Sequence, residues 1–331
     1  MSGRPLHKQH IPRFTLESGE VLTDVVQAYH LDGELNAERD NLVIVFHALT
    51  GSADAVGDWW SSIMGPGRAI DTDRYAVLCT NLLGSCYGTT FRRSERNVLP
   101  RITPRDQARL IHLLVDSLAV SAVALTVGGS LGGMVGLEWA AMYPELTRAS
   151  VVLAAPGAHT ASAIGWNHIQ RQAIALGAEH GLAVARMIGM MTYRTSAEFQ
   201  LRFGREVGAA GFQVESYLNH QGNKLVRRFD VDSYLMLMDS MDLHDVGRER
   251  DGVAGALRGV PGRLVGVGIP GDILYTDADV RDWTEAAGGE YRQIISVHGH
   301  DAFLIEVDQV AAILTEVLED LTAPARLVTG G

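Results

Sequence analysis

Ser130 stands in the sequence setting that nucleophilic catalysis requires. It is the central residue of a G-x-S-x-G segment, 128–132, which follows a run of apolar and β-branched residues and precedes an amphipathic segment. A serine on a sharp turn between a strand and a helix presents its hydroxyl above the sheet, where it can attack an acyl carbonyl. A glycine-rich turn that only packs strand against helix shares the bare motif, but this placement favours the nucleophile. A phosphate loop is disfavoured, because the segment has neither the G-x-G-x-x-G spacing nor a Walker lysine.

Asp272 and His300 are predicted to be the acid and the base that act with Ser130. Asp272 follows the apolar run 263–269, at the carboxyl end of an expected strand, where sites in open α/β sheets form. His300 follows a glycine after the last expected strand and precedes an apolar helix, so its loop can reach over the serine. The chain order serine, aspartate, histidine is that of one known type of catalytic triad.

Other acids and histidines compete for these roles. Asp277 and Asp279 are more consistent with the cap of a helix that starts near them. His298 lies at the end of the expected strand, which is a poorer position for a base than the loop. His47 precedes the nucleophile in the chain, so we expect it to support its loop rather than to accept a proton.

Two backbone N–H groups are predicted to stabilise the oxyanion that acyl transfer creates. One belongs to Leu131, directly after the nucleophile. The other belongs to Leu49, in the loop after the third expected strand.

The elements that must position these residues alternate along the chain. Two short antiparallel strands are expected within 14–31, at a sheet edge. Continuous apolar runs predict buried strands, and segments of helical spacing lie between some of them. The expected strands are 41–49, 75–80, 122–127, 149–155, 263–269 and 291–297, and the expected helices are 104–118, 131–143 and 307–321.

The pattern changes after residue 156. From about 161 to 241 helical periodicity dominates and no strand is expected. We therefore predict the α/β-hydrolase fold, a mostly parallel sheet flanked by helices. Residues 1–156 and 251–331 would form its core domain, and residues 157–250 a helical lid inserted into it.

Composition narrows the class of protein. The 331 residues carry a formal net charge of −11 and no Lys/Arg-rich block, which argues against nucleic acid as a partner. Two cysteines cannot form a disulfide framework, and no metal-ligand spacing is present. The N-terminus lacks the apolar core of a signal peptide, and no stretch is apolar enough to span a membrane. A cytoplasmic enzyme without a metal or a membrane contact is the expectation.

Several longer segments carry a family resemblance over nearly the whole chain. They are HALTGSADAVGDWW, GPGRAIDTDRYAVLCTNLLGSCYGTT, GGSLGGMVGLEWAAMYP, GLAVARMIGMMTYR, ESYLNHQGNKLVRRFDVDSYLMLMDSMDLHDVGR and VHGHDAFLIE. Together they resemble the homoserine O-acetyltransferases of the α/β-hydrolase type, which act in methionine biosynthesis.

The resemblance implies a reaction and a set of residues. In that family a serine takes an acetyl group from acetyl-CoA, a co-substrate rather than a bound cofactor, and passes it to the hydroxyl of L-homoserine. The matching triad is Ser130, Asp272 and His300. The residues that would hold the amino acid are Arg186, Tyr193 and Asp301. A homodimer packed through the lid helices is also implied.

Alternatives remain open at this stage. A surface charge on a helix would account for Arg186, and a helix N-cap for Asp301.

The segment between 171–174 and Gly181 is shorter than in most of the family, and Leu131 stands where methionine is frequent. Relatives transfer succinyl groups or acylate L-serine, and an esterase or thioesterase would use the same triad. An intact triad argues against a non-catalytic binding protein. A small basic cluster, Arg92, Arg93 and Arg96, could meet the CoA phosphates or be a solvated loop.

Overall fold

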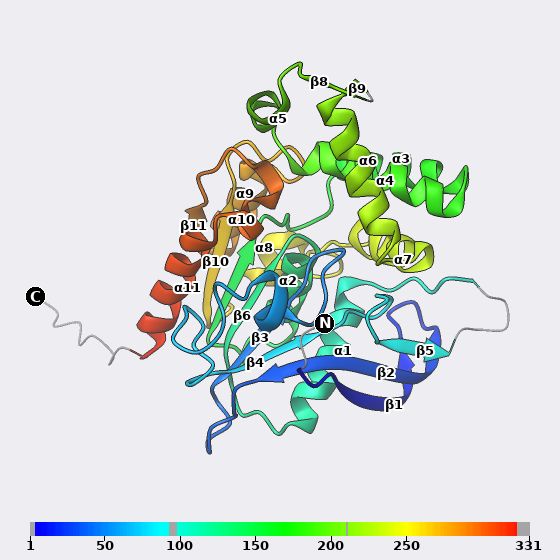
Figure 1. Ribbon diagram of the computed structural model, residues 1–331. Helices are drawn as coiled ribbons and strands as arrows, with labels where there is room; N and C mark the ends of the chain where they lie inside the picture. The colour runs from blue at the N-terminus through cyan, green and yellow to red at the C-terminus, as the bar shows by residue number, and fades with distance from the viewer. Residues whose placement is uncertain (1–3, 93–97, 210, 323–331) are drawn as a thin grey trace, which may run out of the picture.

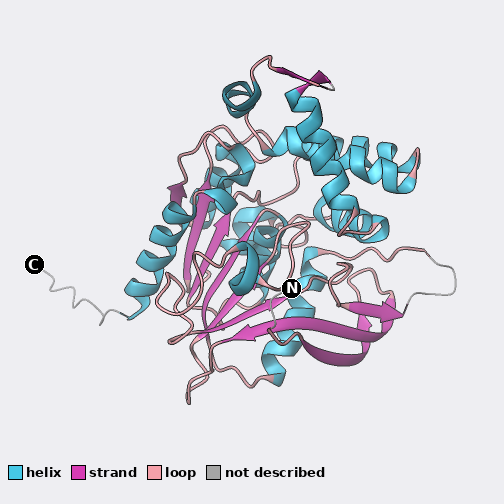
Figure 2. Cartoon of the chain, viewed as in Figure 1, coloured by secondary structure: helices cyan, strands magenta, loops and turns pink. Residues whose placement is uncertain are grey.

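The computed structural model describes residues 4–92, 98–209 and 211–322, and within them nine strands form one sheet (Figures 1 and 2). The strand order is β1-β2-β4-β3-β6-β7-β10-β11, and β5 pairs with β2. The bounds are β1 His7–Thr15, β2 Val21–Asp32, β3 Leu42–Phe46, β4 Ala76–Thr80, β5 Thr90–Arg92, β6 Val123–Gly129, β7 Ala149–Leu153, β10 Arg263–Gly268 and β11 Glu290–Gln293.

The sheet is antiparallel at one edge and parallel elsewhere. β2 runs antiparallel to β1, β4 and β5, whereas the pairs from β4 to β11 are all parallel. In a parallel sheet the carboxyl ends of the strands share one edge, so the loops after β3, β6 and β10 come together there. This is the arrangement predicted for the α/β-hydrolase fold.

Alternate residues of the central strands face two separate hydrophobic layers. Leu42, Ile44 and Phe46 of β3 belong to a cluster with the helices α1 (Pro104–Ser117), α2 (Leu131–Met142) and α9 (Asp277–Ala287). Val43 and Val45 belong to a second cluster with α11 (Val307–Thr322). All five side chains are fully buried, which explains why the strand is apolar without interruption.

The core helices begin where the sequence supplies caps. Thr103 accepts a hydrogen bond from the Asp106 N–H, and the Asp106 carboxylate accepts from the Thr103 N–H, with Pro104 in the first turn of α1. Thr276 and Asp279 form the same reciprocal pair at α9, which ends at Gly288 in the left-handed conformation. The remaining core elements are η1 (Ala55–Trp59), α8 (Gly252–Leu257), η2 (Gly299–Asp301) and α10 (Ala302–Ile305).

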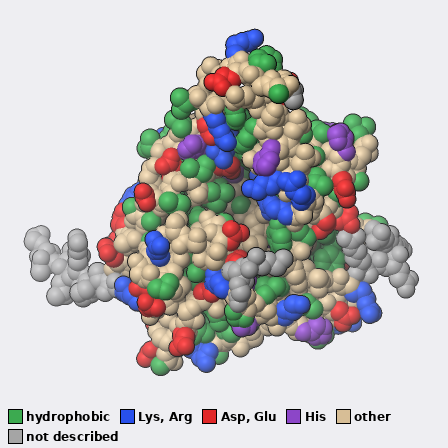
Figure 3. Space-filling view, in the orientation of Figure 1, with side chains coloured by type: hydrophobic (Ala, Val, Ile, Leu, Met, Phe, Trp, Pro, Cys, Tyr) green, Lys and Arg blue, Asp and Glu red, His purple; other side chains and the backbone are tan. Residues whose placement is uncertain are grey.

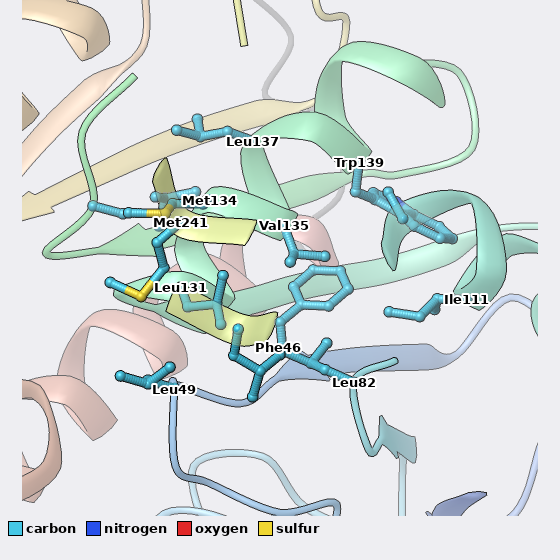
Figure 4. Packing of buried hydrophobic residues seen from close by; sticks show 14 of the residues in the cluster. Phe46, Leu49, Leu82, Ile111, Leu131, Met134, Val135, Leu137, Trp139 and Met241 are labelled. Atoms are coloured by element: carbon cyan, nitrogen blue, oxygen red, sulfur yellow. The ribbon is translucent and has the colours of Figure 1, made fainter. Parts of the chain in front are cut away.

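Between β7 and β10 the chain forms helices, most of which gather beyond the carboxyl edge of the sheet (Figure 1). Met241 of α7 lies beside Met134 of α2, so this group packs directly on the helix that follows Ser130 (Figure 4). Its elements are α3 (Ala161–Ala175), α4 (Ala178–Tyr193), α5 (Ser196–Phe203), α6 (Gln213–Val226) and α7 (Val231–Asp242), with a two-residue hairpin of β8 (Val207–Gly208) and β9 (Gly211–Phe212). The division into a core domain and a lid at 157–250 remains a prediction.

The structure corrects some of the predicted elements. The first hairpin starts at His7 rather than near residue 14, because β1 pairs with β2 along its whole length. β11 ends at Gln293, four residues before the expected end. The short hairpin β8–β9 interrupts a region expected to be wholly helical, since its two-residue strands are too short to produce a periodic pattern. Among the described residues, no helix is both long and apolar enough to cross a membrane.

Candidate active site

Ser130 occupies a tight turn between β6 and α2. Its backbone has φ of +56° and ψ of −125°, a conformation that costs a non-glycine residue about 1–3 kcal/mol. The Ser130 N–H donates to the Leu153 carbonyl of β7 at 3.0 Å, which holds the turn to the sheet. A side chain at Gly132 would overlap the Phe46 carbonyl, and one at Gly128 would overlap the Gly132 carbonyl. The two flanking glycines of the motif are therefore required by close backbone contacts.

The three residues predicted as a triad are in hydrogen-bond contact. His300 Nε2 lies 2.9 Å from Ser130 Oγ, and His300 Nδ1 lies 2.7 Å from Asp272 Oδ2. The residues come from three loops at the carboxyl edge of the sheet, after β6, β10 and β11. Each is at most 5% exposed. With Nδ1 donating to the carboxylate, Nε2 is the nitrogen that can accept the serine proton.

Asp272 is fixed in place by the turn that carries it. Its Oδ1 accepts the N–H groups of Leu274 at 2.8 Å and Tyr275 at 3.1 Å, which leaves Oδ2 for His300. Burial opposes protonation of His300, but the Asp272 carboxylate outweighs it and raises the pKa of the imidazole above its ordinary value. The carboxylate thus both orients the ring and stabilises the imidazolium that proton transfer would form.

The competing acids and histidines lie elsewhere. Asp279 caps α9, and Asp277 accepts hydrogen bonds from Tyr291 and Gln293. His298 Nδ1 lies 3.2 Å from Glu198 Oε2 of α5 rather than beside the serine. The structure therefore brings Asp272 and His300, and none of these alternatives, to Ser130.

His47 orients the peptide unit whose N–H is the predicted oxyanion donor. The Leu49 N–H and the Ala48 carbonyl belong to the same peptide unit. That carbonyl accepts hydrogen bonds from His47 Nδ1 at 2.8 Å and from the Gly51 N–H at 2.9 Å. His47 Nε2 accepts the Leu82 N–H at 3.0 Å. Burial lowers the pKa of His47 to about 4, so the ring is neutral with its proton on Nδ1.

The Leu49 and Leu131 N–H groups are available as donors. In the described part of the chain, neither is engaged by another backbone or side-chain acceptor. Leu131 is the first residue of α2, where the helix dipole adds to the attraction for an anion. Figure 4 shows both leucine side chains among the buried residues of the hydrophobic cluster, and this packing helps to hold the backbone that carries them.

Arg186 and Tyr193 come from α4 and lie close to the triad. The Arg186 guanidinium carbon is 5.5 Å from the centre of the Tyr193 ring, and that ring is 5.8 Å from the His300 ring. Within the described chain no carboxylate pairs with Arg186. A half-buried guanidinium without a carboxylate partner is suited to bind one from a ligand.

Asp301 is already paired with a neighbour that sequence reasoning did not find. Its Oδ2 lies 3.0 Å from Arg194 Nε, and Arg194 Nη1 donates to both oxygens of Glu198 at 2.9 and 3.2 Å. Asp301 stands at the N-cap position of α10, but its side chain makes no capping hydrogen bond. Arg194 and Glu198 are four residues apart, a spacing at which opposite charges pair along a helix. This spacing could not predict the contact of Arg194 with the loop that carries His300.

The basic cluster considered for CoA phosphates is only partly described. Arg92 lies 3.4 Å from Asp24, at the antiparallel edge of the sheet, and Arg93 and Arg96 lie outside the described residues. Among the residues that are described, no three His, Cys, Asp or Glu side chains gather as a metal site. The face in Figure 3 is hollowed near its middle, and Lys and Arg side chains gather beside the hollow, over α6 and α7.

Comparison with known proteins places the chain in a family. Residues 41–233 match the family model of the alpha/beta hydrolase fold. The homoserine O-acetyltransferase of Thermus thermophilus is 44% identical over 344 residues, covering 92% of this chain and 89% of that one. The chain belongs to the homoserine O-acetyltransferase family. The solved structure of homoserine O-acetyltransferase from Staphylococcus aureus agrees, with 30% identity, a TM-score of 0.83 and 95% of each chain covered.

The fold itself extends beyond the homoserine O-acetyltransferase family. Esterase E22 has a TM-score of 0.85 to this chain but only 20% identity, with 95% of this chain and 99% of that one covered. This likeness shows the fold alone, because one scaffold supports several acyl-transfer reactions. The distinction between transferase and esterase therefore depends on sequence similarity and on the residues around the triad.

Proposed function

We propose that the chain transfers the acetyl group of acetyl-CoA to the hydroxyl of L-homoserine, through an acetyl ester on Ser130. The hydrogen-bonded series Ser130–His300–Asp272 carries this proposal. The family membership supplies the substrates, and O-acetyl-L-homoserine for methionine biosynthesis would be the product.

In the first half-reaction His300 Nε2 takes the proton of Ser130 as its oxygen attacks the thioester carbonyl. The tetrahedral oxyanion would be held by the N–H groups of Leu49 and Leu131. Its collapse breaks the carbon–sulfur bond, and the His300 proton passes to the departing thiolate to give free CoA. Acetyl-Ser130 remains, and the imidazole is neutral again.

In the second half-reaction homoserine replaces CoA. His300 accepts the proton of the homoserine hydroxyl, whose oxygen attacks the acetyl carbonyl through a second oxyanion. The ester bond to Ser130 then breaks, and the proton returns to the serine oxygen. Asp272 keeps the ring oriented in both halves without taking the proton itself.

We assign recognition of the amino acid to Arg186, Tyr193 and Asp301. The Arg186 guanidinium suits the carboxylate, and Asp301 suits the ammonium group while it stays paired with Arg194. The Arg186 guanidinium lies over the Tyr193 ring, which faces the ring of His300, the residue before Asp301. An amino acid held in this way would bring its hydroxyl to His300 and exclude water, the competing acceptor.

Release of free thiol is the experiment that tests the proposal. Acetyl-CoA and succinyl-CoA are each supplied with L-homoserine, with L-serine or with no acceptor. Thiol release from acetyl-CoA that depends on homoserine is the expected result. Equal release without acceptor would make the chain a thioesterase, whereas a preference for succinyl-CoA or serine would assign it a sister activity.

Partners beyond the substrates belong to the same proposal. We place the reaction in the cytoplasm, and we infer a homodimer formed through the inserted helices. Two leucines of these segments, Leu176 and Leu201, are 91% and 82% exposed, which supports a covered face in the assembly. Sedimentation should give twice the chain mass of 35.8 kDa. A monomer for the wild type, or a dimer unaffected by Leu176→Glu with Leu201→Glu, would contradict this assignment.

A further inference from the structure

Arg228 joins the inserted helices to the loop that carries the predicted oxyanion donor. It lies two residues after the end of α6, and its guanidinium makes three hydrogen bonds. Nη1 donates to the Thr50 carbonyl at 2.8 Å and to Tyr87 Oη at 2.7 Å, and Nη2 donates to Thr50 Oγ1 at 3.2 Å. Two of the three bonds therefore end on a single residue, the one that follows Leu49.

Thr50 is part of the turn whose geometry decides where the Leu49 N–H points. The Gly51 N–H closes this turn on the Ala48 carbonyl at 2.9 Å, and His47 holds the same carbonyl from the core side. His47 thus fixes the start of the turn, and Arg228 is the only described side chain that donates to the Thr50 carbonyl. The Ala48–Leu49 peptide unit lies between these two anchors.

The second contact of Arg228 ties it to Tyr87, a half-buried residue of the loop after β4. The Tyr87 ring packs edge-on against Phe229 at 5.7 Å. The Tyr87 carbonyl accepts Asn81 Nδ2 at 2.7 Å, and Asn81 Oδ1 accepts the Ala53 N–H at 2.8 Å. The loop after β3 is therefore supported at Thr50 by Arg228 and at Ala53 by Asn81, and the Arg228 guanidinium connects these two supports through Tyr87.

We propose that Arg228 is a positioning residue that holds the Leu49 N–H toward the oxyanion and makes its orientation depend on the seating of the inserted helices. The inference rests on the proposed function, because it uses Leu49 as a donor. A planar guanidinium can reach the carbonyl, the threonine hydroxyl and the phenol at once, whereas the single ammonium of a lysine cannot reproduce this fork. Loss of one oxyanion donor typically lowers the rate by about 10²–10³-fold. A donor that is only misplaced should lower the rate less than this.

The experiment compares Arg228→Ala and Arg228→Lys with Arg227→Ala, an adjacent exposed arginine whose side chain has no hydrogen bond to a described residue. Rates of acetyl-enzyme formation are measured by rapid quench with acetyl-CoA and with an uncharged aryl acetate, followed by breakdown with homoserine. We expect Arg228→Ala to slow both half-reactions about tenfold with either donor, since both pass through an oxyanion. The Michaelis constants should change little, Arg228→Lys should be intermediate, and Arg227→Ala should match the wild type.

Two results would overturn the inference. One is an Arg228→Ala variant as fast as the wild type. The other is a loss limited to a higher KM for acetyl-CoA with normal aryl acetate turnover, which would make Arg228 a contact for CoA phosphates. If Arg228→Ala unfolds, Arg228→Lys is judged by the same criteria. Ser130→Ala is run alongside: acetylation that persists in it, or that is missing in the wild type, would reject the proposed function itself.

Discussion

At the scale of single residues, the protonation state of His300 sets the pH range in which the site is active. The ring accepts the Ser130 proton only while Nε2 is unprotonated, and the Asp272 carboxylate raises its pKa above the ordinary value against the effect of burial. The rate of acetyl-enzyme formation should therefore fall as the pH drops through a raised pKa. In Asp272→Asn only the smaller effect of the Asp301 charge still opposes burial, so the acid limb should move to lower pH while the maximal rate falls by about 10⁴-fold. A pH profile of kcat/KM measures both, and an unshifted limb would show that Asp272 does not set the pKa.

If Arg186 and Asp301 bind the amino acid, substituting either should impair the second half-reaction and leave the first nearly unchanged. Arg186→Gln and Asp301→Asn each remove a charge that would face the amino acid, whereas acetyl-CoA attack on Ser130 does not need either charge. We expect the KM for homoserine to rise by about 10-fold or more in each variant, as loss of a charged hydrogen bond implies. Acetyl-enzyme formation should remain within about twofold of the wild type. Equal losses in both half-reactions would instead indicate that the variants disturb the loop of His300.

Residue-level prediction from the sequence succeeded where chain order and local motif carry the information. Ser130 follows β6 directly, and Asp272 and His300 lie in the loops after β10 and β11, so the fold brings the three together once the strands are recognised. Arg194 and Arg228 were not predicted, because their partners Asp301 and Thr50 are 107 and 178 positions away and pairing across such distances leaves no periodic signal.

At the scale of elements, one buried carboxylate connects two core helices to the end of the inserted segment. Glu138 of α2 is 1% exposed, and its oxygens accept Arg105 Nε of α1 at 3.2 and 3.1 Å and Arg250 Nη1 at 2.7 Å. Glu138→Ala would leave the buried Arg105 without this partner. Because Glu17 and two backbone carbonyls still pair with Arg105, we expect a loss of about 1–3 kcal/mol in the free energy of unfolding.

Urea unfolding of Glu138→Ala and of Arg281→Ala provides the comparison. Arg281 forms an exposed pair with Asp277 at 2.7 Å, and removing it should change the free energy of unfolding only slightly. Similar losses in the two variants would mean that Glu138 contributes no more than a surface charge.

Strands were predicted most accurately where their hydrophobic pattern is strongest. The buried strands β3, β4, β6 and β7 were placed within a few residues, because a strand covered on both faces is apolar throughout. β5 and the hairpin β8–β9 were missed, since strands of two or three residues are stabilised by tertiary pairing and not by a pattern of their own.

At the scale of the whole molecule, two buried neutral histidines should make stability depend on pH. Burial lowers the pKa of His47 to about 4 and that of His244 to about 3, whereas both rings titrate near 6.5 when exposed in the unfolded chain. Below that value the unfolded chain binds more protons than the folded one. The contribution of these two rings to the free energy of unfolding should therefore fall as the pH drops from about 6.5 toward 4, by about 1.4 kcal/mol per pH unit for each ring, whereas the raised pKa of His300 acts in the opposite sense.

Urea unfolding between pH 7 and pH 5 checks this dependence. His244→Asn should reduce the slope by the contribution of one histidine. A slope that is the same in His244→Asn as in the wild type would contradict the expected protonation state of that ring.

The pairing of β7 with β10 has a consequence for how the chain reaches this fold. β10 runs beside β7 from Ala149 opposite Arg263 to Leu153 opposite Val267, yet the whole helical insertion separates the two strands in the sequence. While the chain is being synthesised from its N-terminus, β7 is therefore an unpaired, apolar sheet edge until residues beyond 262 have emerged. Such an edge is a template for pairing with other chains, so refolding yield should decline as protein concentration rises, and the period of greatest risk ends when β10 docks.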